Sequence, residues 1–446
     1  MHIQFFGAAG TVTGSNFLLS DDRRYGVLVD MGMFQGSAEL EELNHKPLNF
    51  DAREVHSVFL THAHLDHCGR LPVLPKHGFS GKAYMTQATK EIAEVVLRDA
   101  AKIMQHDKEK PVLYTKEDVF DFLNLAEVVS YGQELDLGNI KTTFRDAGHI
   151  LGSASLEMQI LDMNKKLAFS GDLGNSPEEL VKPTEYIKNA DVVIMESTYG
   201  DRNHPEDNPD ETLIGEVNLV EKDRGTLLIP SFSVERTQAL LYKINKFKKE
   251  GKINQTTTVY LDSPMGERVT EIYKKFSDLY SKELSEDFKT GDPFSFTGLK
   301  VIQNSQESQQ IHAHDGPKVI IAGSGMMTGG RILSHAMHYL PDPTTRLLIV
   351  GFQAENTLGR ALEEGVKNVN IDGKHVSVNA KITSLHSMSA HADQSKLLGW
   401  LGKISGTKSV FLVHGEDAAR IPLQGEIKKL GIAQVQLPEL NEAFEI

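Results

Sequence analysis

Short apolar runs that stop abruptly at polar or glycine-rich residues recur along the chain. They include "YGVLVDMG" at 25–32, "SVFLTHAH" at 57–64, "KLAFSGDLG" at 166–174, "DVVIMEST" at 191–198, "GTLLIPSFS" at 225–233 and "SVFLVHGE" at 409–416. Near-continuous apolar runs of this length are typical of strands that are buried on both faces. Several lead into segments with helical spacing, such as "VERTQALLYKINKFKKE" at 234–250. The alternation of strands and helices predicts an α/β protein.

Acidic and histidine side chains stand where five of the apolar runs stop. They are Asp30, His62, Asp172, Glu196 and His414. A single Asp or His at a strand end is common in loops that face solvent. Ligands of α/β folds, however, bind beyond the carboxyl ends of the strands. We therefore expect these five side chains to gather in one functional site.

The segment "THAHLDHCG" at 61–69 contains the densest group of side chains that bind metals. Directly after a strand, alternate residues of an extended segment point the same way, so His62 and His64 can share one metal ion. Asp66 and His67, at the following turn, can reach a second ion. Zinc binds imidazole nitrogen and carboxylate oxygen, and a catalytic zinc leaves a position for water. One segment cannot complete two sites, and further candidates beside small residues are His149, Asp172 and His414.

Two polar segments, 205–215 and 363–375, are predicted to be crossings between domains. Four strand–loop–helix units lie between them, which is enough for a separate α/β domain. The strand ends that carry His and Asp lie on both sides of this block, so we expect it to be an insertion. The first domain would comprise residues 1–204 and 371–446, and the inserted domain residues 205–370.

The bulk composition narrows the class of protein. The chain has 446 residues, 40% hydrophobic and 24% charged, which leaves room for two or three globular domains. Cys68 is the single cysteine, which excludes an intramolecular disulfide and fits a reducing compartment. The N-terminus does not resemble a signal peptide, and no apolar stretch approaches the ~20 residues of a transmembrane helix, so we expect a soluble cytoplasmic protein. The net charge of −14 argues against non-specific coating of nucleic acid, although bound metals could supply positive charge locally.

The motifs resemble those of a known superfamily. "THAHLDH" with His149 and Asp172 downstream is similar to the motif set of the metallo-β-lactamase superfamily, whose fold is an αββα sandwich with a two-metal site at one edge. The resemblance implies that His62, His64 and His149 bind one zinc ion. It implies that Asp66, His67 and His414 bind a second, that Asp172 bridges the two, and that Asp30 lies behind the ligands and orients them. Manganese would fit the same histidine and carboxylate ligands.

Three further motifs resemble the markers of the β-CASP group, the nucleases of this superfamily. They are "ESTYGDR" at 196–202, "SAHAD" at 389–393 and "VHGE" at 413–416, and they fall on Glu196, His391 and His414. That group carries an inserted α/β domain beside the metal site, and histidine at the third marker is associated with its RNA-acting members. The resemblance covers essentially the whole chain. It implies a zinc-dependent ribonuclease similar to the compact bacterial and archaeal relatives of the pre-mRNA 3′-end cleavage endonuclease.

The implied reaction gives each marker a role. Two metal ions ~3.5–4 Å apart would bind the scissile phosphate and a hydroxide that attacks phosphorus in line. His391 is the expected proton donor to the leaving 3′-oxygen, and Glu196 would orient it and favour its charged form. The products would be a 5′-phosphate and a 3′-hydroxyl. The catalytic residues would be His391, Glu196 and the metal ligand Asp66. A further metal ligand or a helix cap is the alternative role for His391.

Two loops of the expected insertion suit the binding of RNA phosphates. One places Ser231, Ser233 and Arg236 at an expected helix start, and the other, "GSGMMTGGR" at 323–331, places Gly325 and Arg331 before a second helix. Helix N-termini and glycine turns present free N–H groups to anions. A glycine-rich turn can equally serve only to close a βα unit, so both interpretations stay open.

Two other functions compete with the ribonuclease. A hydrolase of a small-molecule ester or thioester shares the His-x-His-x-Asp-His motif but would lack the insertion. A non-catalytic scaffold would have lost metal ligands, whereas all seven candidates are present. Single-stranded RNA is the expected substrate. The sequence does not determine whether cleavage is endonucleolytic, 5′-exonucleolytic or both. It does not determine the oligomeric state either, and a homodimer is one of the open alternatives.

Overall fold

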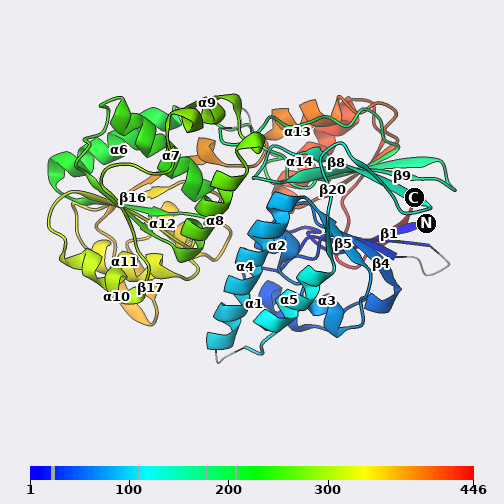
Figure 1. Cartoon of the computed structure of the whole chain (residues 1–446), viewed down its shortest axis with the longest axis horizontal. Helices are drawn as coiled ribbons and strands as arrows, with labels where there is room; N and C mark the ends of the chain where they lie inside the picture. The colour runs from blue at the N-terminus through cyan, green and yellow to red at the C-terminus, as the bar shows by residue number, and fades with distance from the viewer. Residues whose placement is uncertain (22–25, 108–109, 176–178, 206–207) are drawn as a thin grey trace. The chain divides into compact units, whose positions relative to one another are not determined.

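The computed structural model describes residues 1–21, 26–107, 110–175, 179–205 and 208–446 (Figure 1). These residues form two compact units. Unit 1 comprises Met1–Asn203 and His391–Ile446, and unit 2 comprises His204–Ala390. The chain therefore leaves unit 1 once and returns to it, as expected for an inserted domain. No helix of the described ranges is both long and apolar enough to span a membrane.

Unit 1 contains two seven-stranded mixed sheets. The order across the first sheet is β22 (Ala443–Glu445), β1 (His2–Gly7), β2 (Asn16–Ser20), β3 (Gly26–Val29), β4 (Val55–Phe59), β5 (Lys82–Met85) and β6 (Ala126–Val128). The order across the second sheet is β21 (Gln434–Gln436), β20 (Ser409–Val413), β11 (Val192–Glu196), β10 (Lys165–Phe169), β9 (Ala154–Ile160), β8 (Ile140–Asp146) and β7 (Glu134–Asp136). In the first sheet, β3 to β6 pair in parallel and the other strands pair antiparallel. In the second sheet, β10, β11, β20 and β21 pair in parallel and the other strands pair antiparallel.

Aromatic side chains from both sheets form the core between them. Phe5, Phe17 and Phe59 of the first sheet face Phe411, Phe169 and Phe144 of the second, with ring centroids 5.3, 6.3 and 6.1 Å apart. All six rings are buried. Large rings contribute much of the burial energy of a core, and this pairing holds the two sheets face to face.

Helices cover the outer faces of both sheets. Those that follow first-sheet strands are α1 (Ala38–Glu42), α2 (Leu65–Cys68), α3 (Val73–Lys76), α4 (Gln87–His106) and α5 (Lys116–Asn124), with short 3-10 turns at Leu43–His45 and Ala52–Glu54. On the second sheet, Leu397 and Trp400 of α13 (Gln394–Leu401) and Leu423 of α14 (Asp417–Lys429) pack into a separate apolar core. Figure 1 shows α4 and α5 on one side of the sheets and α13 and α14 on the other. Unit 1 is thus an αββα sandwich, as the resemblance of its motifs implied.

Unit 2 is built around a six-stranded parallel sheet. Its order is β14 (Leu299–Val301), β13 (Thr258–Asp262), β15 (Lys318–Ala322), β12 (Thr226–Pro230), β16 (Arg346–Ile349) and β19 (Lys381–Ser384). Its helices are α6 (Pro209–Asp223), α7 (Arg236–Lys249), α8 (Pro264–Lys275), α9 (Lys282–Thr290), α10 (Ser305–Gln310), α11 (Arg331–Tyr339) and α12 (Leu358–Glu363), with 3-10 turns at Ser277–Leu279, Ile311–Ala313 and His386–Met388. Leu228, Ile320 and Leu347 of the sheet pack with Ile332 and Leu340 in its core. The predicted α/β insertion is therefore present.

The return from unit 2 lies later in the chain than the sequence predicted. Residues 371–390 belong to unit 2, because β19 adds to its sheet by pairing in parallel with β16. The segment 363–375, expected to be a crossing, instead contains the turn of a hairpin between β17 (Asn368–Ile371) and β18 (Lys374–Ser377). Asp372 and Gly373 have φ of 48° and 76°, as a two-residue hairpin turn of type I′ requires. Of the other expected crossing, 205–215, residues 206–207 lie outside the described residues, and α6 begins at Pro209.

Candidate metal centre and active site

The candidate site lies at one edge of the unit 1 sandwich, where several strands end. In the second sheet, β10, β11 and β20 run parallel, and β8 has the same direction because both β8 and β10 are antiparallel to β9. In the first sheet, β3 and β4 run parallel. The side chains that follow or end these strands are Asp30, His62, His149, Asp172, Glu196 and His414.

A glycine allows the two loops of the first sheet to approach each other closely. A Cβ atom at Gly32 would stand 1.5 Å from the carbonyl oxygen of Asp66, so only glycine fits the turn after β3. The N–H of Gly32 donates to the carbonyl of Ser15 at 2.8 Å. The turn thereby holds α2, which carries Asp66 and His67, against the loop before β2.

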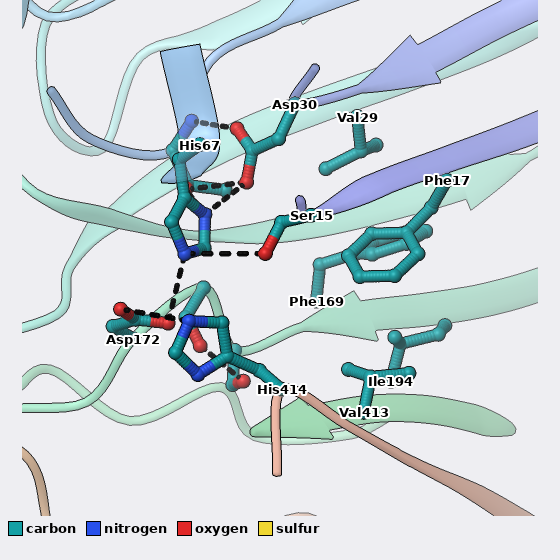
Figure 2. A pocket seen from close by; sticks show the side chains of 13 residues that line it. Ser15, Phe17, Val29, Asp30, His67, Phe169, Asp172, Ile194, Val413 and His414 are labelled. Carbon is teal, nitrogen blue, oxygen red and sulfur yellow. Dashed lines mark hydrogen bonds and ion pairs between the residues drawn. The ribbon is translucent and has the colours of Figure 1, made fainter. Parts of the chain in front are cut away.

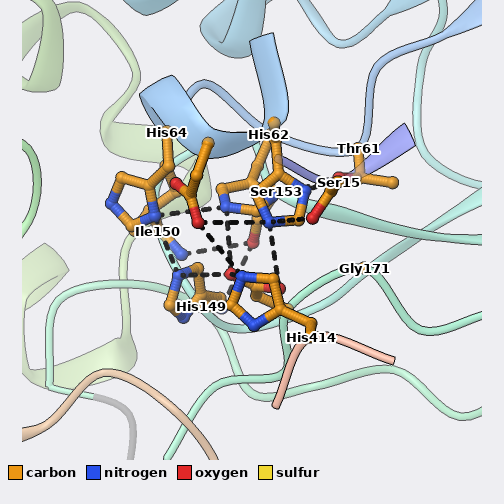
Figure 3. A network of polar contacts seen from close by, with 12 residues as sticks. Ser15, Thr61, His62, His64, His149, Ile150, Ser153, Gly171 and His414 are labelled. Atoms are coloured by element: carbon orange, nitrogen blue, oxygen red, sulfur yellow. Dashed lines mark hydrogen bonds and ion pairs between the residues drawn. The ribbon is translucent and has the colours of Figure 1, made fainter. Parts of the chain in front are cut away.

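Three histidines and one aspartate form the first cluster, and Figure 3 shows its histidines His62, His64 and His149. Nδ1 of His64 lies 3.1 Å from Nε2 of His62 and 3.2 Å from Nε2 of His149. Nε2 of His62 lies 3.3 Å from Oδ2 of Asp172. The ligand atoms of a tetrahedral zinc ion, at about 2.0–2.1 Å from the metal, lie roughly 3.3 Å apart. The spacing of the four atoms thus fits one zinc ion.

Asp66, His67 and His414 form the second cluster. Nε2 of His414 lies 3.1 Å from Oδ2 of Asp66, and Nε2 of His67 lies 3.8 Å from the same oxygen. Their potential ligand atoms all lie within 4.8 Å of one another. These residues fit a second ion, in the grouping that the sequence resemblance implied.

Asp172 faces both clusters. Its Oδ2 lies nearest His62, and its Oδ1 lies 3.3 Å from Nε2 of His67. Both oxygens are buried, yet they accept no hydrogen bond from the part of the chain that the structure describes. A buried carboxylate without hydrogen bonds is strongly unfavourable unless a cation compensates it. This orphaned carboxylate fits a ligand that bridges two metal ions.

The protonation of the first cluster suits metal binding. Burial lowers the pKa of His62 to about 3 and that of His64 to about 4. Burial also holds the pKa of His149 well below its usual range. All three imidazoles are therefore neutral at pH 7, which is the form that binds a metal ion.

Side chains behind the ligands hold the ring nitrogens that face away from the site. Nδ1 of His67 lies 2.8 Å from Oδ2 of Asp30, and Nδ1 of His62 lies 3.0 Å from Oγ1 of Thr61. Thr61 in turn donates both its N–H and its hydroxyl to Asp30, each at 2.8 Å. Such contacts fix the orientation and tautomer of a metal-binding histidine. The structure thus places Asp30 in contact with His67, one of the candidate ligands.

His391 and Glu196 lie next to the first cluster. Nδ1 of His391 is 3.2 Å from Oε2 of Glu196, while Oε1 of Glu196 accepts a hydrogen bond of 2.6 Å from the N–H of Leu173. Burial opposes the charged form of His391, but the carboxylate of Glu196 outweighs it and raises the pKa of His391 to about 9. A nitrogen of His391 also lies within 4.8 Å of ligand atoms of Asp172 and His414, so a metal-ligand role is the competing assignment.

The floor of the site is apolar. Figure 2 shows a small cavity lined on one side by Asp172, His67 and His414 and on the other by core side chains. The apolar lining consists of Phe17, Val29, Phe169, Ile194 and Val413. An apolar surrounding lowers the local dielectric and so strengthens every charge interaction at the site.

The residues expected to bind RNA phosphates lie in unit 2, after β12 and β15, and their polar side chains have partners there. Oγ of Ser231 is 3.1 Å from Oγ1 of Thr237, and Oγ of Ser233 is 3.0 Å from Oγ of Ser263. Arg236 pairs with Glu235 at 3.0 Å and Arg331 with Asp262 at 2.5 Å. A Cβ atom at Gly325 would lie 2.6 Å from the ring of Phe232. These contacts explain the residues structurally, and contact with RNA remains a prediction.

The sequence did not indicate three hydroxyl residues of the site, Ser15, Thr61 and Thr198. Oγ of Ser15 lies 3.3 Å from Nε2 of His67, and Oγ1 of Thr198 lies 3.0 Å from Nδ1 of His414. A hydroxyl residue is common in any loop. Only the position of Thr61 and Thr198 inside the motifs "THAHLDH" and "ESTYGDR" could have singled them out.

Known families and proteins match this chain along its length. Residues 10–215 match the metallo-beta-lactamase superfamily, residues 237–362 the Beta-Casp domain, and residues 375–438 the Zn-dependent metallo-hydrolase RNA specificity domain. The protein named ribonuclease TTHA0252 from Thermus thermophilus is 40% identical over 100% of both chains. The transcription termination factor FttA of Methanocaldococcus jannaschii is 30% identical over 100% of this chain and 72% of its own length. An RNase J-like protein of the same organism is 30% identical over 87% of both.

A solved structure shares the fold. It is a protein of unknown function from Enterococcus faecalis, with a TM-score of 0.55 and 13% identity over 99% of each chain. Fold and site together define a metallo-β-lactamase sandwich with clusters of potential metal ligands and an inserted domain. The chain belongs to the β-CASP group of the metallo-β-lactamase superfamily. The family expected from the motifs is thereby confirmed.

Proposed function

We propose that the protein is a zinc-dependent ribonuclease that hydrolyses phosphodiester bonds of single-stranded RNA and leaves a 5′-phosphate and a 3′-hydroxyl. One observation carries the proposal: the orphaned carboxylate of Asp172 stands between two ligand clusters, with His391 beside it. The names of the relatives, ribonuclease and RNase J-like protein, support RNA as the substrate.

The seven candidate ligands would hold two zinc ions. Those of the first ion are His62, His64 and His149, those of the second are Asp66, His67 and His414, and Asp172 would bridge the pair. Two bound zinc ions would supply positive charge to the scissile phosphate and an activated water as the nucleophile. The chain itself contributes the neutral imidazoles of the first cluster and an apolar floor. It also contributes the carboxylate of Asp172, which accepts no hydrogen bond from the described residues.

His391 would donate a proton to the leaving 3′-oxygen. Its Nδ1 faces Glu196, so the other ring nitrogen is the one available to the substrate. Glu196 would keep the ring charged and oriented until the proton is transferred. General acid catalysis of this kind contributes roughly 10²–10⁴-fold to the rate.

The proposal is tested with wild type, His391→Ala and the control His77→Ala, which removes an exposed histidine of unit 1. The assay measures zinc bound per chain and cleavage of a labelled single-stranded RNA. We expect about two zinc ions in all three proteins. RNA cleavage should be unchanged in His77→Ala and roughly 10²–10⁴-fold slower in His391→Ala.

Two outcomes would contradict the proposal. Equal cleavage by wild type and His391→Ala would remove His391 from its role. A wild type that binds zinc and hydrolyses a thioester, but leaves RNA intact, would favour the small-molecule hydrolase instead. The RNA substrate should therefore be tested beside a simple thioester in the same buffer.

A further inference from the structure

We infer that Thr198 is a positioning residue that fixes the tautomer and orientation of His414 as a metal ligand. The inference rests on the proposed function, because it takes His414 to bind one of the two ions. It adds a further functional residue to the site, beyond the seven candidate ligands and the His391–Glu196 pair.

Thr198 lies between two strand ends of the site. It follows β11 by two residues, and its side chain is buried against the residue that follows β20. Its Oγ1 lies 3.0 Å from Nδ1 and 3.2 Å from the carbonyl oxygen of His414. On the other side of the ring, Nε2 of His414 lies 3.1 Å from Asp66. The imidazole of His414 is therefore held between a hydroxyl and the second cluster.

The hydrogen positions follow from the requirement that Nε2 binds the metal. A neutral imidazole has one N–H, so with Nε2 as the ligand the hydrogen must be on Nδ1. Nδ1–H of His414 then donates to Oγ1 of Thr198, and the hydroxyl of Thr198 donates to the carbonyl of His414. The hydroxyl of Thr198 accepts one of these bonds and donates the other through the same oxygen atom. The hydroxyl of Thr198 also lies 3.5 Å from Nδ1 of His391, but this nitrogen is closer to Glu196, at 3.2 Å. The main partner of the hydroxyl is therefore His414, at 3.0 Å.

Two other candidate ligands are held in the same way. Asp30 holds the far nitrogen of His67, and Thr61 holds that of His62. Thr198 completes this pattern for His414, the ligand that comes from the C-terminal part of unit 1. Partners of this type commonly change metal affinity by about 10–100-fold when they are removed.

The backbone around His414 keeps its hydrogen bonds to Ser197 and Ala8 when the hydroxyl of Thr198 is removed, so the role of Thr198 at the ring can be separated from folding. His414 has a φ of 48°, which is unfavourable for a residue with a side chain. Ser197 stabilises this segment: its hydroxyl donates to the carbonyl of Val413 at 2.6 Å, and its N–H donates to that of His414 at 3.2 Å. Thr198→Val keeps the shape of the side chain and removes only the hydroxyl.

The test compares zinc affinity, by competition with a chelator, in wild type, Thr198→Val, Thr198→Ser and Thr142→Val. Thr142 is a matched control, because it is buried in β8 and its hydroxyl has no hydrogen-bond partner among the described residues. We expect Thr198→Val to bind one of the two zinc ions about 10–100-fold more weakly and the other unchanged. Thr198→Ser should restore the affinity, and Thr142→Val should match wild type. If Thr198→Val does not fold, Thr198→Ala replaces it against the same serine variant.

The inference would be overturned if the valine variant bound both ions with wild-type affinity, or if the serine variant were as weak as the valine variant. A failure of the proposed function is distinguishable from both results. In that case wild type itself would bind fewer than two zinc ions or would leave RNA intact.

Discussion

Both units contain an aspartate buried among histidines, Asp172 in unit 1 and Asp262 in unit 2. Asp262 is fully bonded within its unit. It accepts hydrogen bonds from Ser308 at 2.5 Å, Arg331 at 2.5 Å and His335 at 2.7 Å. Asp172 accepts none from the described residues, although imidazole nitrogens stand 3.3 Å from each of its oxygens. A buried carboxylate that the chain satisfies is structural, whereas one that the chain leaves unsatisfied indicates a cation.

The histidine rings of the two regions differ as well. In unit 1, Nδ1 of His64 faces Nε2 of His62 and of His149, so three lone pairs can meet at one point. In unit 2, Nε2 of His312 also lies 3.1 Å from Nδ1 of His335, but the third ring, that of His338, is stacked on His312, with centroids 4.2 Å apart and planes inclined by 2°. Stacked rings direct their lone pairs in parallel planes, away from a common point. The number of histidines in a cluster therefore matters less than where their nitrogens point.

The largest expected effect is that of Asp172→Asn. The variant removes the ligand shared by both clusters, so we expect it to bind at most one zinc ion. Its RNA cleavage should fall by more than the roughly 10–100-fold typical of residues behind the ligands. Zinc content by elemental analysis and RNA cleavage measure both effects. Retention of two tightly bound ions in Asp172→Asn would show that Asp172 is not a ligand shared by the two clusters.

The counterpart in unit 2, Asp262→Asn, should act on stability instead. Although burial raises the pKa of Asp262, hydrogen bonds from His335, Ser308 and Arg331 outweigh it and hold the pKa below its usual value. The asparagine would leave Arg331 without its ion-pair partner, at a cost of roughly 3 kcal/mol. Faster amide exchange in β13 and β15, with two zinc ions still bound, is the expected result. A loss of zinc from this variant would contradict it.

Removal of the metal by a chelator should affect the two units unequally. A ligand present at 100 times its dissociation constant stabilises the site that binds it by about 2.7 kcal/mol. Chelation should therefore speed amide exchange in residues 61–69 and around His414, and leave β13 and β15 unchanged. Equal acceleration in both units would show that the stabilisation by metal is not local to unit 1.

The smallest expected effect concerns pH and unit 2. Burial, together with His338 and His335, lowers the pKa of His312 to about 4. The unfolded chain takes up a proton near pH 6.5 and the folded chain only near pH 4, so the stability of unit 2 should fall as pH decreases between these values. His312 is half-exposed, and solvent screening limits the effect to below about 1 kcal/mol. Amide exchange of unit 2 at pH 7 and pH 5 should show a smaller difference in His312→Gln than in wild type.

The sequence predicted those parts of the site that depend on local geometry. His62 and His64 converge, and Asp66 and His67 turn to a second cluster, because a strand end followed by a turn fixes these directions within six residues. The αββα fold and the insertion followed from the motifs of a family that the relatives confirm.

Features that depend on partners far along the chain could not be predicted. Thr198 contacts His414, which lies 216 residues away, and its position inside "ESTYGDR" does not indicate this contact. The polar composition of 363–375 suggested a crossing, whereas the Asp372–Gly373 turn forms a hairpin that keeps the chain in unit 2. Likewise, the burial of Ser231 and Ser233 arises from tertiary contacts that a loop sequence does not reveal.

Anomalous diffraction at the zinc edge, from crystals of the full chain grown with zinc, is the strictest test of the proposed two-ion site. We expect two anomalous peaks in unit 1. Both should lie within bonding distance of Asp172, one among His62, His64 and His149 and the other among Asp66, His67 and His414. The proposed two-ion site would be contradicted if no peak lay within bonding distance of Asp172, or if a peak lay beside Asp262 and His335 instead.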